Sequence, residues 1–81
     1  MTKNELQEKL DNLGIDKRAY SLYGGVHDDK YVLSQEPMGK WSVYYSERGL
    51  IFNKRVFENE SLACEYFLKR IQSDTTTKLK Q

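Results

Sequence analysis

Leucines recur at helical spacing near the start of the chain. They follow one another at steps of four and three residues and comprise Leu6, Leu10 and Leu13. Such steps place side chains on one stripe of a helix. Thr2 and Glu5 stand just before the stripe at the spacing of a capping box, in which two side chains satisfy free backbone amides. The pattern predicts an amphipathic helix over residues 3–13, ended by Gly14 in a left-handed conformation.

A second helical pattern lies near the end of the chain. Its broad apolar face consists of Ala63, Cys64, Phe67, Leu68 and Ile71. Asn59 is a favourable N-cap, and Glu60 suits the first turn because its charge opposes the helix dipole. Residues 73–81 show no apolar period, so we predict a mobile tail there, after a single domain that spans residues 1–72.

Between the helices, four segments read as strands. They are residues 18–23, 30–34, 40–46 and 50–57. The third alternates most clearly, with Trp41, Val43 and Tyr45 predicted on the face that packs against the helices. In the fourth, Phe52 and Val56 are predicted on the same core face. Turn residues separate the segments, including Gly24-Gly25 and the left-handed Gly49 expected in a short hairpin.

The resulting order is α-β-β-β-β-α. It predicts an α+β fold in which a four-stranded antiparallel meander carries both helices on one face. The opposite face of such a sheet stays open. Tyr44 belongs to that open face, and Tyr23 joins it, so aromatic side chains that are favoured as interface anchors become candidates for partner binding. Cross-strand packing of half-exposed tyrosines is the alternative explanation.

Composition narrows the class of protein. The chain has 81 residues, enough for one small domain, and 13 Lys and Arg residues nearly balance 12 Asp and Glu residues. That balance argues against the basic excess of a general nucleic-acid binder or of a protein that binds anionic membranes. The chain also shows neither an apolar signal segment nor an apolar run long enough to cross a membrane. We therefore expect a cytoplasmic protein without a membrane partner.

The residue types that most often carry chemistry are scarce. His27 and Cys64 are each the only residue of their kind, so an internal disulfide and a cysteine-based zinc site are excluded in the monomer. Cys64 falls on the apolar helix face and reads as a buried thiol. His27, Asp28 and Asp29 read as a solvated loop rather than a metal site. The sequence thus predicts no enzyme, no catalytic residue, no metal and no cofactor.

Two alternatives to partner binding stay open. A small RNA-binding module has a similar helix and sheet content, but such a module grips phosphate with a lysine-rich start to its second helix. Here residues 58–61 read Glu-Asn-Glu-Ser and would repel phosphate, so no nucleic acid is expected. The other alternative is a structural or regulatory subunit that associates with itself through a sheet edge. The sequence leaves a homo-oligomer undetermined.

One stretch of the chain resembles a known family. Gly24-Gly25, Asp29, Tyr31 and Leu33 precede residues 41–49, which read Trp-Ser-Val-Tyr-Tyr-Ser-Glu-Arg-Gly. The downstream residues that match are Phe57, Glu60, Ala63 and Phe67. Together they resemble small bacterial immunity proteins of polymorphic toxin systems, from about residue 5 to residue 71. The resemblance implies a cytoplasmic antitoxin that binds the C-terminal domain of its cognate toxin stoichiometrically and blocks it.

The resemblance also suggests what the partner looks like. Toxins of these systems are often nucleases, including EndoU-type ribonucleases, and a ribonuclease active site is usually positive. Acidic side chains beside aromatic anchors would complement such a site. The acids available on or near connecting loops are Asp28, Asp29, Glu36, Glu47, Glu58 and Glu60. The residues expected to contact the toxin are Tyr23, Asp28, Asp29, Tyr44 and Glu47.

Overall fold

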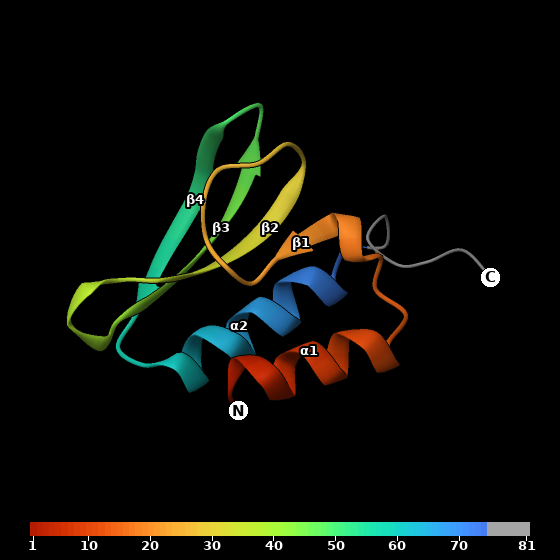
Figure 1. Ribbon diagram of the computed structural model, residues 1–81, viewed down its shortest axis with the longest axis horizontal. Coiled ribbons are helices and arrows are strands. Elements are labelled where there is room, and N and C mark those ends of the chain that lie inside the picture. Colours follow the sequence, from red (N-terminus) through yellow and green to blue (C-terminus); the bar gives the residue numbers. More distant parts are fainter. Residues whose placement is uncertain (75–81) are drawn as a thin grey trace.

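Two helices lie side by side against one face of a four-stranded sheet in the computed structural model of the protein (Figure 1). The structure describes residues 1–74. The helices and strands are α1 (Lys3–Asn12), β1 (Tyr20–Ser21), β2 (Lys30–Gln35), β3 (Trp41–Glu47), β4 (Leu50–Phe57) and α2 (Glu60–Gln72). Two short 3-10 helices, η1 (Lys17–Ala19) and η2 (Pro37–Gly39), complete the order. The α+β class and the α-β-β-β-β-α order are confirmed.

The helix signals in the sequence act as predicted. The Glu5 amide donates to Thr2 Oγ1 at 3.3 Å and the Thr2 amide donates to Glu5 Oε1 at 2.8 Å, which completes the capping box of α1. The Leu62 amide donates to Asn59 Oδ1 at 2.9 Å and caps α2. Leu6 and Leu10 are fully buried in the core, whereas Leu13 lies just beyond the helix and is 42% exposed.

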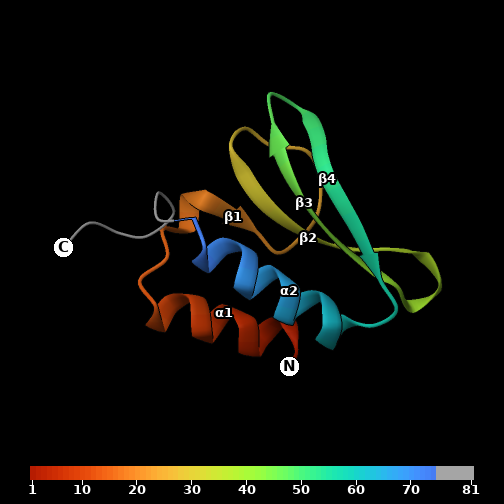
Figure 2. The ribbon, with the colours of Figure 1, turned by 180° about the vertical axis from the view of Figure 1, so that it is seen from behind.

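The core lies between the helices and the sheet. From α2 it takes Ala63, Cys64, Phe67 and Ile71, and the sheet contributes Leu33 and Val43. The Tyr20 ring meets the Phe67 ring edge to face, with centroids 6.4 Å apart. Figure 2 shows the helix pair from behind, with the β3–β4 hairpin extending well beyond it.

The antiparallel meander predicted for the sheet is wrong at its first strand. The strand order is β1-β2-β3-β4 as expected, but β1 pairs with β2 in parallel. Only Tyr20–Ser21 is extended, because Asp16 accepts the Arg18 amide at 2.9 Å and draws residues 17–19 into a 3-10 turn. The chain then crosses the sheet before β2 begins, so both strands run in the same direction.

Within that crossing segment, residues 24–29 form a cover loop over the outer face of the sheet (Figure 1). The Tyr44 hydroxyl donates to the Gly25 carbonyl at 2.6 Å. The His27 amide donates to Ser46 Oγ at 2.7 Å, and Ser46 Oγ donates to the His27 carbonyl at 2.9 Å. Gly24, at φ +69°, lies so close to β2 that a Cβ there would be 2.9 Å from Ser34 Oγ. The face that the sequence pattern left open is therefore partly covered.

The last strand also departs from the prediction. Asn53 adopts φ 54° and the β3–β4 register shifts between Val43 and Tyr45, which marks a β-bulge. Because the bulge inserts one residue, Phe52 pairs with Tyr45 on the helix side while Val56 pairs with Ser42 on the outer side. The prediction of a shared core face for Phe52 and Val56 is wrong, and both are exposed.

The segment that follows α2 is hydrogen-bonded to the sheet. The Tyr31 hydroxyl donates to Asp74 Oδ2 at 2.9 Å, and Ser73 caps α2 through its amide. Residues 73 and 74 therefore contact the domain predicted to span residues 1–72. The remainder of the predicted tail, residues 75–81, lies outside the described residues.

Candidate functional site

Three of the predicted contact residues gather at the tip of the β3–β4 hairpin. Asp28 Oδ1 accepts the Arg48 amide at 3.2 Å, so this loop carboxylate fixes the hairpin turn that follows Glu47. Asp29 Oδ1 lies 3.4 Å from the donating Tyr45 hydroxyl. Asp28, Asp29 and Glu47 are all exposed, so the hairpin tip carries three acids beside the exposed cation Arg48. We call these three residues the acidic tip.

Tyr23 lies elsewhere. It adjoins Gln35 and Trp41, which pair at the end of the sheet opposite to the Lys30–Ser46 pair near the acidic tip. Its side chain is 82% exposed, and the Lys3 ammonium sits 4.2 Å from the ring centroid. The structure therefore separates Tyr23 from the predicted acids.

Tyr44 is not available to a partner. Only 3% of it is exposed, because the cover loop lies over it and takes its hydroxyl hydrogen bond. Burial also raises the pKa of its phenol. The prediction that Tyr44 lies on an open face is wrong, since the sequence pattern could not show that the β1–β2 connection crosses this face.

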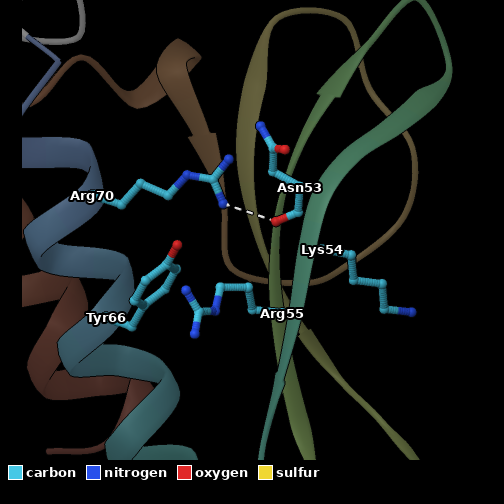
Figure 3. A pocket seen from close by; sticks show the side chains of 5 residues that line it. All are labelled: Asn53, Lys54, Arg55, Tyr66 and Arg70. Atoms are coloured by element: carbon cyan, nitrogen blue, oxygen red, sulfur yellow. Dashed lines mark hydrogen bonds between the residues drawn. The ribbon is translucent and has the colours of Figure 1, made fainter.

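A groove that sequence reasoning missed lies between α2 and β4. It encloses about 480 Å³ and is lined by Asn53, Lys54, Arg55, Tyr66 and Arg70 (Figure 3). Arg55 points from the strand toward Tyr66 on the helix, whereas Lys54 points away from α2. We call this feature the β4–α2 groove.

The two arginines of the groove are held in place by defined contacts. Arg70 Nη1 donates to the Asn53 carbonyl at 3.2 Å, at the bulge, and its guanidinium carbon lies 5.5 Å from the Tyr31 ring centroid. The Arg55 guanidinium carbon lies 5.2 Å from the Tyr66 ring centroid. Cation–π contacts of this kind hold a guanidinium in place while its N–H groups stay free to donate.

The charge of the groove is only partly neutralised. Lys54 reaches the outer side of the sheet, where its ammonium lies 3.4 Å from Glu36 Oε2. Within residues 1–74, no carboxylate forms an ion pair with Arg55 or Arg70. The nearby Tyr31 phenol stays neutral, because burial and the adjacent Asp74 carboxylate raise its pKa to about 12. The groove can therefore bind an anionic group through charge-assisted hydrogen bonds.

Apolar side chains flank the groove along the strand. We define the β4 surface as the exposed apolar residues of that strand, namely Leu50, Ile51, Phe52 and Val56. Phe52 and Leu50 share the helix side with Arg55, while Ile51 and Val56 lie on the outer side. Exposed apolar residues next to Arg and Tyr are typical of protein interfaces.

The remaining reactive groups are engaged in the fold. Cys64 is fully buried in the core, and burial raises the pKa of its thiol to about 11. His27 Nε2 lies 2.8 Å from the Gly24 carbonyl oxygen. Among the described residues, no cluster of three or more His, Cys, Asp or Glu side chains could hold a metal ion. No helix within residues 1–74 is long and apolar enough to cross a membrane.

A sequence signal for the groove exists but is weak. Tyr66 and Arg70 stand four residues apart, which places them on the same side of α2. Only the folded chain brings that side next to Arg55 and the Asn53 bulge.

Comparison with known proteins found no matching family model, no similar curated protein and no similar solved structure. The resemblance to immunity proteins therefore stays a prediction from the sequence.

Proposed function

We propose that this chain is a cytoplasmic immunity protein, an antitoxin that binds the C-terminal domain of a cognate toxin and occludes it without catalysis. The toxin proposed is a nuclease, such as an EndoU-type ribonuclease. The observation that carries the proposal is the β4 surface, where Leu50 and Phe52 stay exposed on the same side of the sheet as two arginines that contact tyrosine rings. Interfaces concentrate their binding energy in Arg, Tyr and other aromatic anchors of this kind.

The acidic tip supports the same proposal. Glu47 pairs directly with Leu50, so the acids and the apolar β4 surface are continuous at the end of the hairpin. A positively charged nuclease site would attract Asp28, Asp29 and Glu47, while the apolar residues would hold the partner in place. Tyr23 lies at the other end of the sheet, and Tyr44 is buried. Both are therefore left out of the proposed contact surface.

The test is complex formation with a defined partner. We would express the full chain together with the tagged C-terminal domain of the protein encoded immediately upstream, and ask whether a stoichiometric complex survives high salt. Immunity predicts such a complex and restored growth relative to the toxin domain alone. A harmless domain, or one that does not bind, would overturn the proposal.

A matched pair of variants locates the surface. Phe52 on β4 and Leu13 beyond α1 are equally exposed at 42%, so Phe52→Ala and Leu13→Ala remove similar exposed apolar groups. Phe52→Ala should weaken binding by more than about 1 kcal/mol, while Leu13→Ala should leave the affinity unchanged. Equal affinities for both variants would contradict the β4 surface as the contact site.

A further inference from the structure

The β4–α2 groove has a chemistry opposite to that of the acidic tip. We infer that the groove receives an acidic side chain of the partner, an Asp or Glu carried on an apolar segment, and holds its carboxylate between Arg55 and Arg70. This inference rests on the proposed function for the identity of the partner and adds the chemical character of the element that is recognised. The partner would then present both a positive surface to the acidic tip and an acid to the groove.

The two arginines have hydrogen-bond donors that the fold does not use. Arg70 gives one N–H to the Asn53 carbonyl, and Arg55 only faces the Tyr66 ring. A guanidinium carries five N–H donors, and a carboxylate is the acceptor that matches their planar geometry. Because no carboxylate among residues 1–74 pairs with either arginine, a partner's carboxylate would not have to displace one.

The site is partly arranged before a ligand binds. Arg70 contacts the Asn53 carbonyl and the Tyr31 ring, and the exposed Arg55 contacts the Tyr66 ring, so each guanidinium is oriented in part. Tyr66 in turn packs on Phe57, with ring centroids 5.1 Å apart. Side chains that are already ordered lose less conformational entropy when a ligand arrives, which favours binding.

The charges on β4 favour a segment of a different protein over a second copy of this chain. β4 is an edge strand whose charged residues are Lys54 and Arg55, and residues 50–57 contain no acid. Antiparallel pairing of two β4 strands would bring these cations close to their counterparts, and like charges across strands are destabilising. A segment with apolar and acidic residues complements the same surface. The charge pattern therefore favours a partner of different composition.

The groove can be tested without the toxin. We would titrate the isotope-labelled full chain with a short peptide that alternates Val and Glu, and with a matched peptide that alternates Val and Lys. The Val–Glu peptide should cause saturable shifts of the Asn53, Arg55 and Arg70 amide signals, and the double variant R55Q/R70Q should weaken its binding about fivefold or more. The double variant K9Q/K17Q removes two exposed lysines that do not line the groove, so it should bind like the original chain.

Two results of the titration would overturn the inference. One is an equal response to both peptides, or shifts scattered outside the groove. The other is preferential, steeply salt-dependent binding of a short RNA at the same amides, which would assign the groove to nucleic acid.

The same variants separate this inference from the proposed function. In the complex with the upstream toxin domain, R55Q/R70Q should lose about tenfold or more in affinity, and K9Q/K17Q no more than about twofold. Equal affinity of both variants would overturn the inference and leave the immunity function standing. If the toxin domain fails to bind while the Val–Glu peptide binds the groove, the immunity function falls and the carboxylate site stands.

Discussion

Strands β3 and β4 pair along their length except at the bulge, yet their surroundings are opposite. In β3, the polar residues Ser42 and Ser46 are completely buried. In β4, apolar residues such as Leu50, Ile51 and Val56 are exposed. Within β4, only Phe57 is partly buried. From polarity alone, the serines of β3 would be expected at the surface and the apolar residues of β4 in the core.

The difference arises from what lies over each strand. β3 has α2 on one side and the cover loop on the other, so even its polar side chains lose contact with water. They remain satisfied, because Ser42 Oγ donates to Glu36 at 2.6 Å and Ser46 bonds twice to the His27 backbone. β4 lies at the sheet edge, beyond the reach of the loop and only partly under α2 (Figure 2). β4 is therefore an apolar strand that the fold leaves exposed, as is common at surfaces that bind partners.

The largest expected effect contrasts one phenylalanine from the core with one from β4. Phe67 is 1% exposed, so Phe67→Ala should lower the free energy of unfolding by about 3–5 kcal/mol. Phe52→Ala should cost only about 1 kcal/mol, because the ring is already partly in water. Urea denaturation of both variants measures the contrast. Similar losses would show that β4 is more deeply packed than the structure indicates.

Removing the anchor of the cover loop should have an intermediate effect. Ser46→Ala deletes both hydrogen bonds to the His27 backbone and should cost about 2 kcal/mol, because the half-buried His27 amide loses its partner and the His27 carbonyl keeps only the Gly49 amide. Amide hydrogen exchange of residues 24–27 should become faster. Ser21→Ala, which loses one weak exposed contact to the Tyr23 amide, is the control. Unchanged exchange in Ser46→Ala would mean that the loop is held by other contacts.

The buried thiol of α2 predicts a loss of stability at alkaline pH. Burial raises the pKa of Cys64 from 9.0 to about 11, so the folded chain keeps a proton that the unfolded chain releases. The stabilisation that this bound proton gives the folded chain is complete below pH 9 and is lost as the pH rises toward 11. The free energy of unfolding should therefore fall by about 1 kcal/mol between pH 9 and pH 10. Cys64→Ala should flatten this part of the profile, and a slope that persists would point to other groups.

The smallest expected effect concerns the bulge that shapes β4. Asn53→Ala forces an alanine into the left-handed region at φ 54°. It should lower the free energy of unfolding by about 1 kcal/mol at most. Asn53→Gly should be neutral or slightly stabilising, because glycine adopts this conformation without strain. Thermal unfolding of the two variants gives the comparison. A strand that tolerates both changes equally would show that the bulge is not held at Asn53.

The local signals in the sequence predicted the elements well and the site poorly. The capping box, the Asn59 cap and the alternation in β3 each depend on neighbouring residues, so they could be read directly. The burial of Tyr44 depends on the loop at Gly25, 19 residues earlier in the chain, and the groove depends on Arg55 and Arg70 lining one space from two different elements. Such contacts have no local pattern. The acids of the hairpin tip could be located on loops because turn residues mark both loops in the sequence. The sequence did not show that these two loops lie next to each other.

The sequence by itself determined two capped helices, the strand segments around clear turns, a buried Cys64 and the α+β order, because short-range geometry and apolar periodicity are written in adjacent residues. Only the tertiary structure decided the parallel pairing of β1, the cover over the outer face, the exposure of β4 and the placement of Arg55 and Arg70 along one groove. Each of these depends on which distant segment lies on a given face, and that is settled by packing of the whole chain.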